Sequence, residues 1–243
     1  MNYDYDSMTP YDYDSIPAGY YDVVFRQKRG IQSKWHHLRF ERVAREVSSG
    51  SVHLDVGCGP GSFISTLPDD VDCIGVDVTS VQVEYARSKY GKRGKRFSVI
   101  APGILPFSRD TFDIVTLLEL VEHISAREAE VLLGEVFRVL RPGGKIVLTT
   151  PNYASLWPLL EILVDRFGGV AYADQHITKY VGSSLRRLIA QIGFRDVSVE
   201  TWLFSAPFVA ALSWGLADRV NRWESALVAR RGGHLLIGTA CKP

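Results

Sequence analysis

The sequence predicts an α/β protein built on one doubly wound, mostly parallel sheet of seven strands with helices on both faces. From Ser51 onward, short segments typical of buried strands alternate with segments of helical periodicity, which is the pattern of a parallel sheet with crossover helices. The chain has 243 residues, of which 46% are hydrophobic and 23% charged. These fractions are those of an ordinary globular domain and exclude a disordered or fibrous chain. We therefore expect a single domain over residues 23–243.

The expected elements follow one another along the chain at regular spacing. Apolar runs bounded by turn residues predict strands over 52–56, 72–77, 97–100, 112–118, 145–150, 197–202 and 234–241. Two capping boxes, Thr79 to Gln82 and Ser125 to Glu128, predict the starts of helices after the second and fourth strands. Further helices are expected over 182–192 and about 207–229.

Two segments of opposite charge precede the first strand. Residues 1–22 repeat Tyr-Asp-Tyr-Asp at 3–6 and 11–14 and carry five Asp with no Lys or Arg. We expect this tail to be flexible, or alternatively to order as a flap over a site. Residues 23–47 carry seven Lys or Arg against two Glu, with helix expected in the second half. That segment is interpreted either as a solvated helix or as a lid that faces an anionic substrate or a lipid headgroup.

Cysteine content and hydropathy indicate a compartment. The three cysteines, Cys58, Cys73 and Cys241, form no Cys-x-x-Cys pair, as expected in a reducing cytoplasm. The acidic N-terminus does not resemble a secretory signal, and the apolar stretch from Trp202 to Ala217 is too short to span a bilayer. With 28 basic and 27 acidic residues the net charge is +1, which gives no general attraction to nucleic acid. We expect a cytoplasmic protein.

A glycine-rich loop directly follows the first strand. Its sequence is Asp55-Val56-Gly57-Cys58-Gly59-Pro60-Gly61-Ser62, and Asp77 ends the second strand 20 residues after Gly57. Glycines allow a tight turn and close approach of the backbone to a ligand, and an acid at Asp77 can accept both ribose hydroxyls. Ser62 replaces the Gly or Ala of the dinucleotide fingerprint. Asp55 would repel a pyrophosphate but suits the ammonium group of S-adenosylmethionine.

These residues resemble the class I S-adenosylmethionine-dependent methyltransferases. The resemblance extends from about Ser51 to Thr150 and includes Phe112-Asp113 and the stretch Leu140 to Gly144. It implies a Rossmann-like methyltransferase fold, S-adenosyl-L-methionine as cofactor, and cofactor-binding residues at Asp55, Gly57, Gly59, Gly61, Asp77, Val78 and Leu118. Arg39 stands much as an arginine does in the ubiquinone-biosynthesis O-methyltransferases, where it meets the cofactor carboxylate. Ala101 departs from the family, because many members carry there an Asp that accepts from the adenine amino group.

An acid–acid–histidine sequence follows the fourth strand. If the segment is helical, Glu119, Glu122 and His123 share one face, and two carboxylates with an imidazole suit a divalent cation. The segment is similar to that of metal-dependent O-methyltransferases of ubiquinone biosynthesis and of small-RNA 3′ ends. That similarity implies His176 as a fourth ligand to Mg²⁺, Mn²⁺ or Zn²⁺, and Glu119, His123 and His176 as catalytic residues. A metal-free acid/base role for His123 or His176, and a purely structural role, remain alternatives.

The acceptor is indicated only in outline. Thr149 to Tyr153 resembles a Thr-Pro-Asn stretch of the ubiquinone-type enzymes and leads into a strongly apolar insertion, expected as a cap over 151–181. The cap either covers the sheet edge or forms a lipophilic wall with peripheral membrane contact. We expect methylation of a hydroxyl on a small, partly apolar molecule, with lipid-linked and sugar-containing molecules as candidates. The alternatives are a metal-free C- or N-methyltransferase and a non-catalytic cofactor-binding module.

Nucleic acid is disfavoured as the acceptor. The Asn/Asp-Pro-Pro-Tyr/Phe motif that serves exocyclic nitrogens is absent from the sequence. The dense basic run at 91–96 falls between a helix and a strand, where a solvated loop is the simpler interpretation. The sequence does not indicate an oligomeric state.

Overall fold

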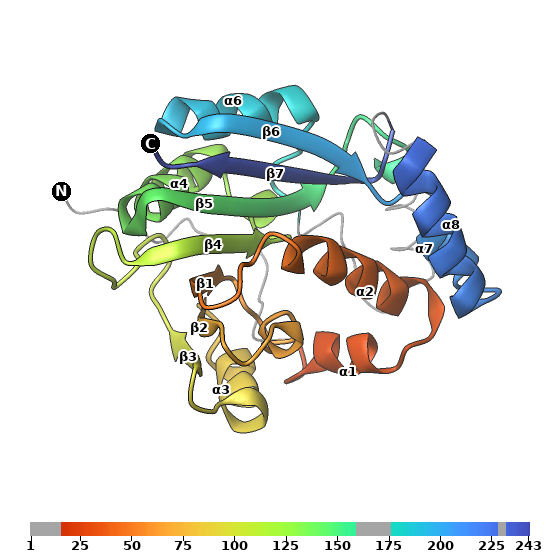
Figure 1. Cartoon of the computed structure of the whole chain (residues 1–243), viewed down its shortest axis with the longest axis horizontal. Coiled ribbons are helices and arrows are strands. Elements are labelled where there is room, and N and C mark those ends of the chain that lie inside the picture. Colours follow the sequence, from red (N-terminus) through yellow and green to blue (C-terminus); the bar gives the residue numbers. More distant parts are fainter. Residues whose placement is uncertain (1–15, 159–175, 228–231) are drawn as a thin grey trace.

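The centre of the molecule is one seven-stranded sheet in the order β3-β2-β1-β4-β5-β7-β6 (Figure 1). The computed structural model describes residues 16–158, 176–227 and 232–243. The strands are β1 (Val52–Val56), β2 (Asp72–Asp77), β3 (Lys95–Val99), β4 (Phe112–Leu118), β5 (Leu140–Pro151), β6 (Arg195–Trp202) and β7 (Leu235–Cys241). β7 runs antiparallel to β5 and β6, and the other pairings are parallel. The predicted doubly wound, mostly parallel sheet is confirmed.

Helices cover both faces of the sheet. They are α1 (Tyr20–Arg26), α2 (Gly30–Ala44), α3 (Ser80–Tyr90), α4 (Ala126–Val139), α6 (Gly182–Ile192), α7 (Ala206–Val209) and α8 (Trp214–Leu227), with short 3₁₀ turns η3 (Ile64–Thr66) and η4 (Val121–His123). One core packs α4 and α6 against β1, β4, β5 and β7. A second core packs α2, α3 and η3 against the opposite face. Apolar side chains on both faces explain why the central strands read as nearly continuous hydrophobic runs.

The strand order places the site. The chain lays β2 and β3 on one side of β1 and then crosses to place β4 on the other side. Ligands of such sheets bind beyond the carboxyl ends of the strands where the order reverses. The loops that follow β1, β2 and β4 therefore meet at one edge, and these loops carry the sequence motifs.

One of the two predicted capping boxes is confirmed and the other is wrong. At the start of α4, the Ser125 hydroxyl accepts from the Glu128 N–H at 3.3 Å, and the Glu128 carboxylate accepts from the Ser125 N–H at 2.7 Å. At the start of α3, Thr79 makes no side-chain cap. The Gln82 side chain instead accepts from the N–H of Gly19 at 3.0 Å and donates to the carbonyl of Ile16 at 3.1 Å. Gln82 thus holds the N-terminal segment, and tertiary contacts have replaced the local cap.

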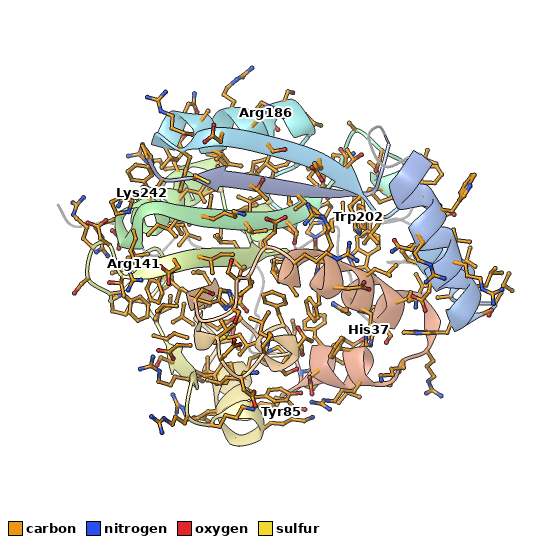
Figure 2. All side chains as sticks on the ribbon, in the orientation of Figure 1. His37, Tyr85, Arg141, Arg186, Trp202 and Lys242 are labelled. Atoms are coloured by element: carbon orange, nitrogen blue, oxygen red, sulfur yellow. The ribbon has the colours of Figure 1, made fainter. Side chains whose placement is uncertain are left out.

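The N-terminal segment packs against the domain earlier than expected. Ile16 is buried and α1 begins at Tyr20, so the tail boundary expected at residue 22 lies inside a packed segment. Residues 1–15 lie outside the described residues. Asp22 on α1 is fully buried against α3, where its carboxylate accepts from the hydroxyl of Tyr85 at 3.0 Å. Figure 2 labels Tyr85 on α3.

The basic segment 23–47 forms two helices rather than one. α2 buries Trp35, Leu38, Phe40 and Val43 in the second core, so the second half of this segment is packed against the domain. His37 lies between the two helices (Figure 2), with its Nε2 2.9 Å from the carbonyl oxygen of Phe25.

The remaining differences concern element boundaries. The single helix expected over about 207–229 is divided into α7 and α8, because the chain turns at Ser213, whose hydroxyl accepts from the Leu216 N–H at 3.3 Å. Most of the cap expected over 151–181 falls at 159–175, outside the described residues. Its two described ends meet, since the Tyr153 N–H donates to the Tyr180 carbonyl at 3.0 Å. No helix in the described ranges is long and apolar enough to cross a bilayer.

Candidate active site

The glycine loop turns the chain sharply out of β1. Gly57, Gly59 and Gly61 all have positive φ, at 73°, 48° and 78°. A Cβ on Gly61 would lie 2.8 Å from the Phe97 ring, so this glycine is required for packing. A Cβ on Gly59 would meet nothing within 4 Å. The backbone at Gly59 therefore borders open space, as expected where a ligand approaches the loop.

Asp77 is fixed by backbone donors at the end of β2. Its Oδ2 accepts from the Gly59 N–H at 2.8 Å and its Oδ1 from the Thr79 N–H at 2.9 Å. Burial raises the pKa of Asp77, and these N–H donors oppose the rise. Each carboxylate oxygen can accept a further hydrogen bond. The carboxylate is thus held beside the loop with capacity to accept ribose hydroxyls.

Asp55 is a buried carboxylate on β1. Only 2% of the residue is exposed, and its Oδ1 accepts from the Thr116 hydroxyl at 2.6 Å. Burial raises the pKa of Asp55 to about 7; the nearby Asp77 charge adds to the rise, while Thr116 and Arg39 oppose it. A buried acid next to a second acid is stabilised by a cation. Asp55 therefore fits the ammonium group of S-adenosylmethionine better than it fits a phosphate.

Arg39 and Glu119 form an ion pair across the site. The Arg39 Nη1 lies 2.7 Å from the Glu119 Oε2, and both groups are largely buried. Glu119 follows β4 directly with φ of 56°, and the Trp35 Nε1 donates to the same Glu119 oxygen at 3.4 Å. The Nε of Arg39 and the Oε1 of Glu119 have no hydrogen-bond partner among the described residues. The pair thus retains a buried donor and a buried acceptor for a ligand.

The acid–acid–histidine sequence is not one helical face. Only Val121 to His123 form a 3₁₀ turn, and the left-handed backbone at Glu119 turns that side chain toward Arg39. Candidate ligand atoms of Glu122, His123 and His176 all lie within 4.8 Å of one another. Glu119 is not a member of this group, which departs from the expected four-ligand arrangement. A short turn cannot align residues that are three and four positions apart as a helix does.

The carboxylate of Glu122 is the most unusual group at this place. Glu122 is fully buried, and neither oxygen makes a hydrogen bond of ordinary geometry among the described residues, although the Thr150 hydroxyl and the Glu122 N–H act to lower its pKa. Burial and the charge of Glu119 raise the pKa of Glu122 well above its usual range. An unpaired buried carboxylate is costly unless a cation or a proton neutralises it. Glu122 is therefore held ready for a cation, a proton or a hydrogen-bond donor.

The glycine loop and the histidine-bearing turn are in contact. A Cβ on Gly57 would lie 3.1 Å from the side chain of Leu120, and the His123 N–H donates to the Leu120 carbonyl at 3.0 Å. The glycine loop, which we also call the cofactor loop, therefore lies in the same site as Glu122, His123 and His176, which we call the acid–histidine group. Two further residues were expected to bind the cofactor. Val78 directly follows Asp77 and is 49% exposed, and Leu118 is the half-buried last residue of β4.

Aromatic side chains border the acid–histidine group. The Tyr153 hydroxyl lies 2.9 Å from the His176 Nδ1, and the ring centroids of His123 and His176 are 5.1 Å apart. The Trp157 ring lies 6.5 Å from His176 and 5.2 Å from Trp35 on α2. These rings give the site an apolar wall beside its charged residues.

Several of these neighbours were not identified from the sequence. The sequence marks Thr116, Trp157 and Tyr180 only as parts of a strand or of an apolar insertion, and Tyr153 only as part of a stretch that resembles the ubiquinone-type enzymes. Only Thr116 could have been found from the sequence, because it is a polar residue within the apolar run of the fourth strand, two residues before the strand ends. Tyr180 is buried with no partner for its hydroxyl in the described structure, and burial raises its pKa to about 12.

Comparison with known proteins identifies the family. Residues 28–199 match the family described as a methyltransferase domain. The chain belongs to this methyltransferase family. It is similar to the ubiquinone/menaquinone biosynthesis C-methyltransferase UbiE of Geobacter sulfurreducens, with 27% identity over 70% of this chain and 73% of the relative. It is also similar to the O-methyltransferase cnsE of Penicillium expansum, with 30% identity over 80% of this chain and 70% of the relative.

Solved structures agree on the fold. A methyltransferase from Thermotoga maritima that depends on S-adenosylmethionine superposes with a TM-score of 0.65 at 17% identity, covering 92% of this chain and 94% of its own. A second one, from Archaeoglobus fulgidus, gives 0.63 at 21% identity, covering 92% of this chain and all of its own. Together with the family match, this establishes a Rossmann-like, S-adenosylmethionine-dependent methyltransferase. The open space beside Gly59 and the two neighbouring carboxylates of Asp55 and Asp77 fit that cofactor.

Proposed function

We propose that this methyltransferase transfers a methyl group to a hydroxyl of a small, partly apolar molecule, and that a divalent cation held by Glu122, His123 and His176 assists it. The observation that carries the proposal is the fully buried carboxylate of Glu122, which makes no hydrogen bond of ordinary geometry among the described residues and lies within 4.8 Å of two imidazoles. The aromatic wall of Trp35, Tyr153 and Trp157 supports an acceptor with an apolar part.

The residues around the glycine loop are assigned to different parts of the cofactor. We assign the ribose to Asp77, the ammonium group to Asp55 and the carboxylate to Arg39 in the binding of S-adenosylmethionine, which when bound supplies an electrophilic methyl group on sulfur. The Arg39 charge is already shared with Glu119, so Glu119 orients the guanidinium rather than binding a metal. The contact between Gly57 and Leu120 keeps the acid–histidine group, where the acceptor would bind, next to the cofactor loop. Much of the rate enhancement would then come from the proximity of the acceptor hydroxyl to the methyl group.

The three proposed ligands favour particular ions. Two imidazoles and one carboxylate suit Zn²⁺ or Mn²⁺ better than Mg²⁺, which prefers oxygen ligands. A cation at this position would favour the alkoxide form of an acceptor hydroxyl, as it acidifies bound water. Tyr153 would serve as the outer partner that fixes the His176 ring through Nδ1. The same residues can act without a metal, with one histidine taking the acceptor proton.

The cation is tested by metal content and by binding. The purified protein is stripped with EDTA and titrated calorimetrically with Zn²⁺, Mn²⁺ and Mg²⁺. We expect one bound ion per chain, and we expect Glu122→Gln to weaken its binding at least about tenfold. Glu130→Gln is the matched control, because Glu130 is an exposed acid on the adjoining helix. Equal ion binding by both variants, or none by the unaltered protein, would contradict the metal site.

The acceptor is tested by product identification. Incubation of the metal-loaded protein with isotopically labelled S-adenosylmethionine and cell extract, followed by mass spectrometry, should yield a product with a new O-methyl group. The rival is metal-free methylation at carbon, which the name of the C-methyltransferase relative favours. A product carrying its new methyl group on carbon, formed at full rate by metal-stripped protein, would establish that rival.

A further inference from the structure

Three buried polar side chains line up on one face of the sheet beneath the cofactor loop. His53 and Asp55 are two residues apart on β1 and therefore point to the same face. Thr116 on β4 is the direct cross-strand partner of Asp55. The exposed fractions of His53, Asp55 and Thr116 are 0%, 2% and 0%. These groups are shielded from bulk water, so their hydrogen bonds are made with other protein groups or with a bound ligand.

The three side chains form a continuous hydrogen-bond chain. The Thr116 hydroxyl donates to the Asp55 Oδ1 at 2.6 Å, and the His53 Nε2 lies 2.8 Å from the same hydroxyl oxygen. A hydroxyl has only one proton. Because Thr116 gives that proton to Asp55, it must accept from His53, which places the imidazole proton on Nε2. The chain therefore has one direction, from His53 through Thr116 to Asp55.

The surroundings of His53 support this direction. Burial lowers the pKa of His53 to about 3, so the ring is neutral and carries a single proton. Its Nδ1 has no hydrogen-bond partner among the described residues, and the ring packs nearly perpendicular to the Phe63 ring at a centroid distance of 5.8 Å. A proton on Nδ1 would be buried without an acceptor, whereas a proton on Nε2 is satisfied by Thr116.

We propose that Thr116, oriented by His53, is a positioning residue that keeps Asp55 ionised and turned toward the ammonium group of S-adenosylmethionine. The charged groups around Asp55 make this donor important. Asp77 on β2 opposes ionisation, while Arg39 on α2 favours it. Cys58 in the loop is buried and its pKa is raised well above the usual range, so it stays neutral. The inference rests on the cofactor and on the role given to Asp55, and it does not require the acceptor or the cation proposed above.

The test measures binding of S-adenosylhomocysteine by calorimetry between pH 5.5 and 8.5. Thr116→Val removes the hydroxyl at almost constant volume, and Thr116→Ser retains it. A hydrogen bond to a charged group is typically worth a pKa change of about one unit or more. We expect Thr116→Val to raise the apparent pKa of the binding profile by about one unit and to weaken binding about tenfold near pH 6. Thr116→Ser should follow the unaltered protein.

A second ligand separates this role from a general packing defect. The analogue of S-adenosylhomocysteine that lacks only the amino group cannot pair with Asp55, and its affinity should change less than about twofold in Thr116→Val. His53→Phe should shift the profile for S-adenosylhomocysteine in the same direction as Thr116→Val, by less. The proposal is overturned if the profile of Thr116→Val matches that of the unaltered protein, if both ligands lose affinity equally, or if Thr116→Ser fails to restore binding. Loss of the cation or of hydroxyl methylation would leave these results unchanged.

Discussion

The buried carboxylate of Asp22 offers the sharpest test of how the N-terminal helix is held. Its oxygens accept from the Ser62 hydroxyl at 2.9 Å, the Tyr90 hydroxyl at 2.6 Å and the Lys89 ammonium at 2.7 Å, besides Tyr85 and Arg26. These donors come from α1, from α3 and from the residue that follows Gly61. One side chain therefore joins the first helix to the cofactor loop.

The cost of removing this carboxylate follows from the burial of its partners. Asp22→Ala leaves the buried Ser62 hydroxyl and two half-buried tyrosine hydroxyls without their charged acceptor. Lys89 and Arg26 are partly exposed and regain water. Hydrogen bonds to a charged group contribute about 1.5–3 kcal/mol each, and some of this is recovered by solvation. We expect the free energy of unfolding to fall by about 3 kcal/mol, or a Tm lower by roughly 6–12 °C for a chain of this length.

Asp69→Ala is the matched control. Asp69 also pairs with a lysine at 2.7 Å, but its side chain is 78% exposed. Exposed ion pairs typically contribute at most about 1 kcal/mol, so this variant should lose little stability. Urea unfolding followed by far-ultraviolet circular dichroism at pH 7 compares the two. If the loss for Asp22→Ala lies within about 1 kcal/mol of the loss for Asp69→Ala, the reasoning from burial is wrong.

The pH dependence of this difference has a definite sign. Burial acts to raise the pKa of Asp22, but the donors Lys89, Tyr90, Ser62 and Tyr85 outweigh it and the folded-state pKa is lowered. A lowered pKa gives stability that is present above the unfolded-state value, near 4, and lost as the pH falls through the folded-state value. The stability gap between the unaltered protein and Asp22→Ala should therefore be constant from about pH 5 to 7 and narrow below about pH 4.

Four further substitutions test the glycine loop, a helix interior and a helix cap. Gly61→Ala places a Cβ 2.8 Å from Phe97 at a positive φ, so we expect a loss of about 2 kcal/mol in stability and weaker binding of S-adenosylhomocysteine, measured by thermal melting and calorimetry. Gly134→Ala, at an exposed helical position where the added Cβ would meet no neighbouring side chain within 4 Å, should raise the Tm instead, since it stabilises the helix by about 0.5–1 kcal/mol; a lower Tm would contradict this. Ser125→Ala removes the confirmed cap and should cost about 1 kcal/mol in urea unfolding, whereas Ser88→Ala, on an exposed face of α3, should cost less than about 0.5 kcal/mol.

Local sequence determined the sheet, the cofactor loop and one helix cap. The alternation of strand and helix patterns predicted all seven strands, because side-chain period and turn residues act over a few positions. The three glycines and the spacing to Asp77 predicted a ribose-binding turn for the same reason, and Asp55, Ser62 and the resemblance to the methyltransferases then indicated the cofactor. At Ser125 the cap and its partner are three residues apart, so the sequence contained the whole interaction.

Tertiary structure alone decided which distant side chains meet. Gln82 had the sequence of a capping residue, yet it binds the backbone of residues 16–19, more than 60 positions away. Glu119 had the spacing of a metal ligand, yet a left-handed backbone and an ion pair with Arg39, 80 positions upstream, leave it outside the group of Glu122, His123 and His176. Thr116 became important only because β4 pairs with β1 and sets its hydroxyl against Asp55. A polar group that is buried on folding takes whichever partner the packed core brings within reach, and no local pattern encodes that choice.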